Sequence, residues 1–376
     1  MMLLASLSLL VWLYLLLGHG QFWRSDPVLA PACPVTAPSV TAVVPARNEA
    51  KVIARSLQSL LAQDYCGRLS IIVVDDSSSD CTGPIARSLE PHIDGAHRLT
   101  VLDGSPCPAG WSGKIWAVAQ GLAQADATEL ILLTDADIVH DPRHVATLIA
   151  KAQRDDLDLV SELVALACDT PAERVLVPAF VFFFQLLYPF ARVNDPLRAE
   201  AAAAGGTMLI RRRALERIGG VAAVRGALID DVALAAAIKR GGRIWLSHST
   251  LARSVRTYPR AADVWRMITR TAYVQLRFSP VVLVAVVLAM VLTFLVPPVA
   301  TVLGHGPTPW LGWLSWGAMA VTYRPTLRRL DRSVLWAPVL PAAAAFFVAA
   351  TLGSAAHHHF GRGAEWKGRT YQRAGA

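Results

Sequence analysis

The feature that most constrains this chain is a series of short apolar runs that end on polar residues. Residues 69–76 (LSIIVVDD) are a continuous apolar run followed by two acids, the pattern of a strand buried on both faces of a parallel sheet. Further strands are predicted at residues 39–46, 98–104 and 129–138, and helices at 49–63, 81–92 and 113–125. This alternation over residues 40–160 predicts a doubly wound open α/β sheet.

Polar clusters follow three of these predicted strands. They are PARNEA at residues 45–50, DDSSSD at 75–80 and TDAD at 134–137. In open α/β sheets, ligands bind in the crevice outside the carboxyl ends of the strands. The clusters therefore predict a ligand site at one edge of the sheet.

Asp135 and Asp137 are the acids of the third cluster. In an extended segment residues i and i+2 point the same way, so we expect two carboxylates side by side. Two like charges at that distance repel each other unless a cation lies between them. Hard oxygen ligands suit Mg²⁺ or Mn²⁺ bound to a diphosphate. The alternative is a solvated turn in which Asp137 caps a helix.

The first two clusters allow two readings each. Short acceptor side chains after residue 75 can bind a nucleobase or ribose, or they can form an Asx turn and helix cap from Ser79, Asp80 and Thr82. Asn48 and Glu49 can lie at the mouth of the same pocket, or they can start the following helix. Both readings of each cluster stay open at this stage.

Gly113 and Lys114 open the helix predicted after the loop DGSPCPAGWS. A helix N-terminus with a lysine suits a phosphate. The sequence does not meet the P-loop pattern, and the alternative for Lys114 is a solvated surface charge.

Apolar stretches at both ends of the chain indicate membrane segments. Charged residues make up 17% of the chain and hydrophobic residues 54%. Residues 2–17 are apolar throughout, and we expect a retained anchor rather than a cleaved signal peptide, since no basic region precedes them. Residues 281–303 are long enough to span a bilayer, 309–323 are short, and 334–353 are long enough but carry two prolines.

The formal charge of +8 is concentrated in basic clusters at residues 211–217, 256–277, 324–332 and 361–373. Such clusters next to apolar stretches favour anionic headgroups or an anionic substrate over nucleic acid. The clusters at 324–332 and 361–373 both favour the cytoplasmic side, so one of the three late segments is expected to be re-entrant or interfacial. The five cysteines show no metal-ligand spacing and are expected to be reduced thiols. His357, His358 and His359 are consecutive, so we expect an interfacial cluster rather than a metal site.

Taken in order, the motifs resemble the inverting family 2 glycosyltransferases with a GT-A fold. The matching segments are VPARNEA, VVDDSSSDCT, GKIWAVAQGL, LLTDADIVHDP, GGTMLIRRRALERIGG, IDDVALAAAIKRGGRI and WKGRTY. Within that family the chain is similar to the hopene-associated glycosyltransferases of hopanoid-producing bacteria, which also combine an N-terminal anchor, a WSGKxWA loop and apolar C-terminal segments. The resemblance implies a Rossmann-like, doubly wound mixed sheet.

The resemblance also implies nucleotide-binding roles for residues that match the family's motifs. Pro45, Asn48 and Glu49 are expected to shape the uridine pocket. Asp76 resembles the acid that binds the base, with Asp75 supporting it.

The remaining matched residues lie on the side of the diphosphate and the acceptor. Lys114 resembles the lysine near the nucleotide, Asp135 is expected to contact ribose or donor, and Asp137 to hold the metal with Asp135. Asp231 stands where the family has its catalytic base, and Asp230 replaces the usual Glu. The alternative for Asp230 and Asp231 is helix capping.

The sequence departs from processive family members, because residues 266–279 (RMITRTAYVQLRFS) lack the Q-x-x-R-W motif. This argues for transfer of a single sugar. Arg270 and Arg277 are candidates for diphosphate contacts or for a basic interfacial helix. Trp366 and Arg369 belong to a tail motif that resembles one in lipid-modifying members, which requires the tail to be cytoplasmic.

The expected organisation is an anchor at residues 1–20, a cytoplasmic catalytic domain at 38–278, membrane segments at 279–356 and a basic cytoplasmic tail at 357–376. We expect a multi-pass protein of the bacterial inner membrane. It is expected to move a sugar from a nucleotide donor, of UDP type, to a lipid acceptor. A hopanoid-related acceptor is implied only by the resemblance. The alternatives are a non-catalytic nucleotide-sugar-binding assembly module and a metal-dependent nucleotide-sugar hydrolase.

Overall fold

The computed structural model describes residues 1–90, 97–360, 365–366 and 369–370. The chain forms two compact units. The first, called here the sheet unit, contains residues 26–167 and 192–256, and the second, the helical unit, contains residues 1–25, 168–191 and 257–376. Residues 168–191 and 257–278, expected in the catalytic domain, therefore cluster with the helices.

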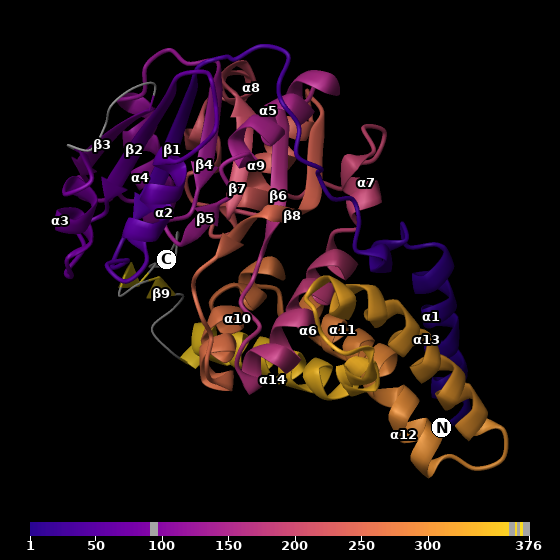
Figure 1. Cartoon of the computed structure of the whole chain (residues 1–376). Helices are drawn as coiled ribbons and strands as arrows, with labels where there is room; N and C mark the ends of the chain where they lie inside the picture. Colours follow the sequence, from indigo (N-terminus) through magenta and orange to yellow (C-terminus); the bar gives the residue numbers. More distant parts are fainter. Residues whose placement is uncertain (91–96, 361–364, 367–368, 371–376) are drawn as a thin grey trace. The chain divides into compact units, whose positions relative to one another are not determined.

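The sheet unit is built on one mixed sheet of eight strands in the order β3-β2-β1-β4-β7-β6-β8-β5 (Figure 1). β1 pairs in parallel with β2 and β4, whereas β7 runs antiparallel to β4 and β6. The strands are β1 Val40–Ala46, β2 Leu69–Asp75, β3 His97–Asp103, β4 Leu130–Thr134, β5 Ile138–His140, β6 Leu159–Ala165, β7 Thr207–Arg211 and β8 Ile244–Ser254. The α/β class and the strands predicted at residues 39–46, 69–76 and 98–104 are confirmed, whereas the strand predicted at 129–138 ends at Thr134 and a turn separates it from β5.

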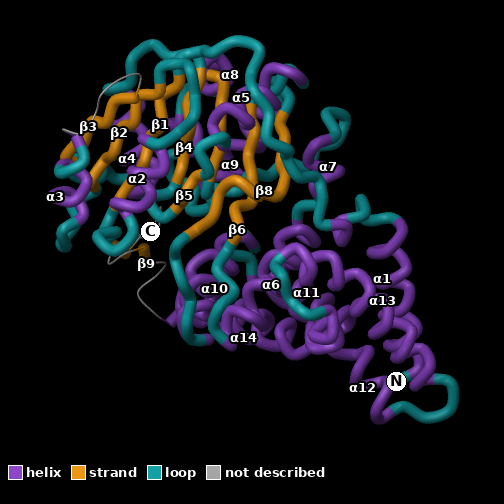
Figure 2. The backbone as a smooth tube through the Cα atoms, viewed as in Figure 1, coloured by secondary structure: helices purple, strands orange, loops and turns teal. Residues whose placement is uncertain are grey.

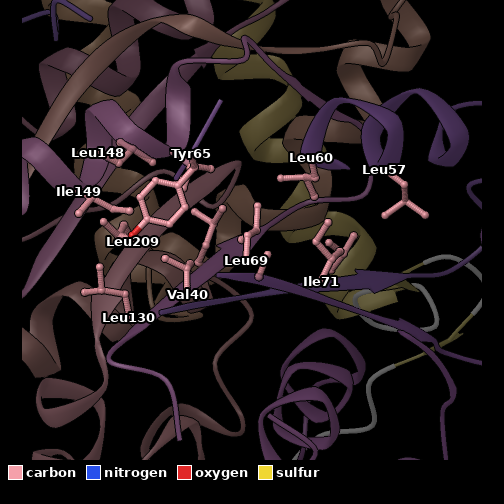
Figure 3. Packing of buried hydrophobic residues seen from close by; sticks show 14 of the residues in the cluster. Val40, Leu57, Leu60, Tyr65, Leu69, Ile71, Leu130, Leu148, Ile149 and Leu209 are labelled. Atoms are coloured by element: carbon pink, nitrogen blue, oxygen red, sulfur yellow. The ribbon is translucent and has the colours of Figure 1, made fainter. Parts of the chain in front are cut away.

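Helices cover the sheet, and their apolar side chains close its core. On one face Leu57 and Leu60 of α2 and Leu148 of α5 belong to the same buried cluster as Val40 and Leu69 of the strands (Figure 3). Each such fully buried side chain stabilises the fold by roughly 1.5–3 kcal/mol. The helices of this unit are α2 Ile53–Leu61, α3 Thr82–Arg87, α4 Gly113–Ala123, α5 His144–Arg154, α8 Arg212–Arg217 and α9 Asp230–Lys239; α7 Phe190–Asn194 joins the two units in sequence.

Close approach explains two glycines of the sheet unit. A Cβ on Gly121 of α4 would lie 2.6 Å from Cγ1 of Val43, so glycine lets this helix pack directly on β1. A Cβ on Gly242 would lie 1.9 Å from Oδ2 of Asp158, so a glycine is needed where the chain passes from α9 to β8.

The helical unit contains long helices (Figure 2). Its buried core is rich in aromatic side chains. Its helices are α1 Met2–Leu17, α6 Pro171–Leu187, α10 Ala261–Gln275, α11 Pro280–Met290, α12 Val296–Leu303, α13 Thr308–Arg329 and α14 Leu340–Phe360, and its short strands are β9 Glu365–Trp366 and β10 Arg369–Thr370. Pro297 has no backbone N–H, so the carbonyl of Thr293 four residues earlier lacks its usual helical donor. The indole N–H of Trp12 donates to this carbonyl at 2.8 Å, which anchors α1 to a π-helical turn.

Two helical segments of the described chain are long and apolar enough to cross a membrane, Pro280–Leu303 and Val334–Phe360. None of the residues of α11 is buried. The N-terminal α1 is shorter, at 16 residues, and its role as an anchor stays a prediction. The apolar stretch at residues 177–190 places Phe182 and Ala179 in the buried core of the helical unit.

Candidate active site

The loops that follow β1 and β2 are joined by hydrogen bonds from backbone N–H groups to side-chain oxygens. The N–H of Asn48 donates to Ser78 Oγ at 3.0 Å, and Oδ1 of Asn48 accepts from the N–H of Ser79 at 2.8 Å. The N–H of Glu49 donates to Thr82 Oγ1 at 2.7 Å. Both residues precede the first turn of α2, so they belong to the loop and not to the helix. The polar clusters after neighbouring strands therefore do meet at one edge of the sheet.

Asp75 and Asp80 shape the second loop. Oδ1 of Asp75 accepts from the N–H of Ser78 at 3.0 Å, and Oδ1 of Asp80 accepts from the N–H of Thr82 at 3.0 Å. These are the Asx-type contacts that the sequence allowed. They hold the loop in shape.

Asp76 is fully buried at the carboxyl end of β2. Its N–H donates to the carbonyl of Ala46 at 2.8 Å, and its Oδ2 lies 3.8 Å from Nη1 of Arg47. Pro45 is buried one residue earlier on β1, opposite Val74. The predicted base-binding residues thus lie at the carboxyl ends of two neighbouring parallel strands.

Lys114 is the centre of an acidic cluster drawn from four segments. It opens α4, and its Nζ lies 2.9 Å from Oδ1 of Asp135 and 3.3 Å from Oδ2 of Asp230. Asp231 belongs to the same cluster, since Gly205 approaches both its carboxylate and Lys114 Nζ: a Cβ there would lie 3.2 Å from each. Burial lowers the pKa of Lys114, but the three carboxylates outweigh it and hold that pKa above its usual value.

The electrostatics separate the roles of these acids. Burial, followed by the neighbouring carboxylate of Asp230, raises the pKa of Asp231 from 3.8 to about 6. Burial also raises the pKa of Asp135, with Lys114 opposing it. Oδ2 of Asp231 accepts from the N–H of Gly205 at 2.8 Å, which fixes its direction. A carboxylate with a pKa near the working pH suits a general base.

The extended segment expected from Asp135 to Asp137 is wrong, although the two carboxylates stay close enough that burial and the charge of Asp137 together raise the pKa of Asp135. The N–H of Ile138 donates to the carbonyl of Asp135 at 3.2 Å, so the segment between β4 and β5 is a turn and not extended. Asp135 pairs with Lys114, while Asp137 pairs with Arg256 and Ser254. A turn breaks the period of two that would place both side chains on one face.

Sequence reasoning missed Arg256 and Ser254, just after and at the end of β8. Nε of Arg256 lies 2.8 Å from Oδ2 of Asp137, and its Nη2 bonds the carboxylate of Glu49. The hydroxyl of Ser254 donates to Oδ2 of Asp137 at 3.0 Å. Arg256 opens the basic stretch 256–277, which the sequence assigned to lipid or anionic substrate. Only its distance along the chain from Asp137 hid the pairing.

The donor set of this turn fits a divalent cation that arrives with a diphosphate. The described residues contain no group of three or more His, Cys, Asp and Glu side chains arranged around a common point. Mg²⁺, however, is commonly held by one or two carboxylates, with phosphates and water supplying the other ligands. Asp135 and Asp137 offer such carboxylates, each balanced by a basic side chain that can turn to the phosphates.

Four of the predicted diphosphate and tail contacts belong to the helical unit. Arg270, in α10, and Arg277, just after it, belong to the helical unit and are exposed there. Trp366 and Arg369 lie in β9 and β10, and their side chains are outside the described part of the structure. A role of these residues at a diphosphate stays a prediction. The predicted interfacial histidines end α14, where His359 Nε2 lies 3.0 Å from the hydroxyl of Tyr273.

Comparison with known proteins agrees with this geometry. Residues 41–219 match the family model described as "Glycosyl transferase family 2". The matched segment contains the loops after β1, β2 and β4, as well as Lys114 and Gly205.

Curated relatives resemble parts of the chain. A "Probable glycosyltransferase YdaM" of Bacillus subtilis (strain 168) is 27% identical over 231 residues, which are 61% of this chain and 50% of the relative. A 4,4'-diaponeurosporenoate glycosyltransferase of Staphylococcus aureus (strain bovine RF122 / ET3-1) is 33% identical over 132 residues, 35% of this chain and 32% of the relative. The chain thus spans half or less of the length of these relatives.

The fold has a counterpart among solved structures. A mannosyltransferase from Pyrobaculum calidifontis, solved in complex with GDP-Man and Mn²⁺, superposes with a TM-score of 0.58 at 21% identity. The superposition covers 92% of this chain and 99% of that one. At this identity the likeness establishes a GT-A-like α/β fold with C-terminal helices.

Proposed function

We propose that this chain is a family 2 glycosyltransferase, since residues 41–219 match the model of that family. It transfers a single sugar from a nucleotide donor, of UDP type, to the hydroxyl of a lipid acceptor. The observation that carries this proposal is the cluster of Asp231, Lys114 and Asp135 beside the strand-end loops. This cluster combines a proposed general base, Asp231, with the positive charge of Lys114, and we assign the nucleotide to the loops beside it.

Inversion at the anomeric carbon follows from a single displacement. The acceptor oxygen forms a bond to the anomeric carbon as the bond to the diphosphate oxygen breaks, and the acceptor proton passes to Asp231. A positioned carboxylate of this kind accelerates such a step by roughly 10²–10⁴-fold. Asp230 acts on this base electrostatically, since its charge raises the pKa of Asp231.

Negative charge grows on the departing diphosphate, and basic side chains are placed to stabilise it. Lys114 at the N-terminus of α4 is the first, since helix N-termini favour phosphate. Arg256 is the second, once it turns from Asp137. When bound, Mg²⁺ or Mn²⁺ held by Asp137 and Asp135 would neutralise part of the same charge. The mannosyltransferase solved with Mn²⁺ supports this choice of ion.

The nucleoside half of the donor is assigned to the loops after β1 and β2. Pro45, Asn48 and Glu49 border the pocket, and Asp76 with Asp75 is assigned to the base. The close ties between these loops support this assignment, because a preformed rigid pocket loses little entropy on binding.

The acceptor is assigned to the lipid phase because of the helical unit. The two long apolar segments offer the surface that an apolar acceptor requires. One of them contains α11, in which no residue is buried. The relative named for 4,4'-diaponeurosporenoate supports an apolar acceptor. A hopanoid-related alcohol is the acceptor class that the family resemblance favours.

This function places the protein in the inner membrane with its sheet unit in the cytoplasm, where nucleotide sugars are made. The proposed domain map keeps an anchor at 1–20, catalysis at 38–278, membrane segments at 279–356 and a cytoplasmic tail at 357–376. Arg270, Arg277, Trp366 and Arg369 are proposed contacts of the diphosphate and the tail.

Release of nucleoside diphosphate from a panel of UDP-sugars tests the proposal on detergent-solubilised protein. We expect release that depends on added lipid extract and is lost in Asp137→Asn, with the exposed Asp156→Asn as matched control. Release without lipid, unchanged by adding it, would identify a hydrolase. No release from either protein with any extract would identify a binding module.

A further inference from the structure

A chain of buried polar side chains crosses the sheet unit behind the site. Thr134 ends β4, His140 ends β5, His144 starts α5 and Glu162 lies on β6. All four are at most 3% exposed. Burying so many polar groups is costly unless each is paired, so their arrangement needs a reason.

The hydrogen bonds of these side chains are continuous. Glu162 Oε2 lies 2.8 Å from His144 Nε2, His144 Nδ1 lies 2.8 Å from His140 Nδ1, and His140 Nε2 lies 3.2 Å from Thr134 Oγ1. The hydroxyl of Thr134 donates to the carbonyl of Gly206 at 2.8 Å. We call Glu162, His144, His140 and Thr134 the buried polar chain.

The far end of the buried polar chain touches the catalytic cluster. The carbonyl of Gly206 also accepts from the N–H of Asp135, at 3.4 Å. The adjacent Gly205 donates to Oδ2 of Asp231 at 2.8 Å. Whatever fixes the Gly205–Gly206 turn therefore fixes the direction of both acids.

Elementary proton counting sets a direction along the buried polar chain. The one hydroxyl proton of Thr134 is donated in the hydrogen bond to the carbonyl of Gly206. Thr134 Oγ1 must therefore accept a hydrogen bond from the Nε2–H of His140. Burial, followed by the neighbouring His144, holds the pKa of His140 well below its usual value, so His140 is neutral and its Nδ1 accepts. His144 must then donate from Nδ1.

The other end of the buried polar chain is fixed by serines of β8. Ser249 Oγ accepts from the N–H groups of Leu251 and Ala252, so its hydroxyl proton goes to Glu162 Oε2 at 2.8 Å. Ser247 donates to Oε1 of Glu162 at 3.3 Å. Two hydroxyl donors favour the ionised form of Glu162, so we assign the proton between Oε2 and His144 Nε2 to His144, which then carries both ring protons.

We infer that Glu162 and His144 form a buried ion pair that, through His140, orients the Thr134 hydroxyl and so positions Asp231 and Asp135. The role of these positioning residues rests on the function proposed above. None of the four touches the reacting atoms. Glu162 acts by keeping His144 doubly protonated, and reversal of that state reverses every bond up to Gly206.

Glu162→Gln tests the direction because it is nearly isosteric and removes the charge. His144 then keeps only Nε2–H, His140 must donate from Nδ1, and Thr134 must donate to His140 and release Gly206. On full-length protein labelled with ¹⁵N-histidine, we expect the wild type to show two protonated nitrogens for His144 and Nε2–H for His140. In Glu162→Gln we expect one protonated nitrogen for His144 and Nδ1–H for His140. Ring shifts that stay as in the wild type would overturn the inference.

Thr134→Val and Thr134→Ser test the positioning and remain available if Glu162→Gln fails to fold. Valine removes the hydroxyl at constant shape and should lower kcat about 10-fold with the donor KM within about 2-fold, whereas serine should retain most of kcat. Thr41→Val removes a buried hydroxyl on β1, outside the buried polar chain, and is the control for stability loss. Equal kcat in all three Thr variants would overturn the positioning role.

A double-mutant cycle and amide exchange complete the test. If the residues act as one chain, Thr134→Val in the Glu162→Gln background should add little to either single effect, and multiplying effects would contradict it. The amide proton of Gly205 should exchange about 10-fold faster in Thr134→Val than in Thr41→Val. Exchange and ring shifts do not require activity, so a wild type without transfer would reject the proposed function while these readouts still decide the inference.

Discussion

Nε of Arg256 lies 2.8 Å from Oδ2 of Asp137, although 118 residues separate them along the chain. The same guanidinium bonds the carboxylate of Glu49. Arg256 thus holds together two acids from different strand ends, at the place where the sequence predicted a metal ion. An internal cation keeps these buried carboxylates from repelling each other when no donor is bound.

Arg256→Gln should make the protein depend on a divalent cation for stability. Without the guanidinium, Glu49 and Asp137 are left as unbalanced carboxylates, which should cost about 1–3 kcal/mol in the free energy of unfolding. Mn²⁺ should restore part of that loss by binding the folded state. Thermal unfolding with and without Mn²⁺ measures this, with no nucleotide present.

The matched control is Arg253→Gln, which removes an exposed arginine of β8, three residues before Arg256. We expect its Tm to respond to Mn²⁺ as the wild type does. Equal Mn²⁺ responses of the Arg256 and Arg253 variants would show that Arg256 does not occupy a cation position.

The pH profile should report Asp231. Because its pKa is raised to about 6, kcat/KM should fall as the pH drops through that value and the base takes up a proton. Asp231→Asn should lower kcat by roughly 10²–10⁴-fold and remove this limb. Initial rates from pH 5 to 8 measure both, and a variant with full activity would contradict the assignment.

The same raised pKa has a consequence for stability. The folded chain binds the Asp231 proton more tightly than the unfolded chain, so this group's contribution to stability falls as the pH rises from about 4 to about 6. Asp231→Asn should therefore unfold at the same or a higher temperature than the wild type at pH 7. A clearly lower Tm for Asp231→Asn than for the wild type at pH 7 would contradict the claim that the charged Asp231 destabilises the folded protein.

Lys114→Gln should move the acid limb of the pH profile upward. The variant removes the cation that lies 2.9 Å from Asp135 and 3.3 Å from Asp230, so each remaining acid holds its proton more tightly. We expect kcat/KM to fall about 100-fold because charge on the diphosphate is also left unbalanced. Lys51→Gln, at an exposed lysine, is the control. An acid limb that stays at the wild-type pH in Lys114→Gln would show that Lys114 does not act on the pKa of the base.

The helical unit should anchor the chain in lipid. We expect wild-type protein to stay in the membrane pellet after alkaline carbonate treatment. Arginines at Val284 and Leu288, which are 57% and 63% exposed on α11, should weaken this by about 2.5–3.5 kcal/mol each at a central position. Val35→Arg, at a 93% exposed loop position, is the control. Release of the wild type by carbonate would contradict the lipid-facing assignment.

The strand and helix pattern of the sheet unit was predictable because burial on both faces leaves an apolar run with sharp ends. β2 and β4 were found in this way, and so was the start of α4 at Gly113. The local direction of Asp135 and Asp137 was not, because a two-residue turn replaced the expected extended segment. Pattern periods describe regular elements and fail where one ends.

Long-range pairing was the second limit. Nothing near Arg256 in sequence indicates Glu49 or Asp137, and Glu162, His140 and His144 read separately as isolated polar residues. Their contacts follow from a strand order in which β8 pairs with both β6 and β5. Single-sequence patterns do not contain that order.

Mass spectrometry of lipids formed from a panel of isotope-labelled UDP-sugars tests the central claim most directly. With membrane lipids and Mn²⁺, the wild type should produce a lipid that carries one labelled sugar, and Asp231→Asn should produce at least about 100-fold less. A wild type that forms no labelled lipid, or an Asp231→Asn variant that forms as much as the wild type, would contradict the account.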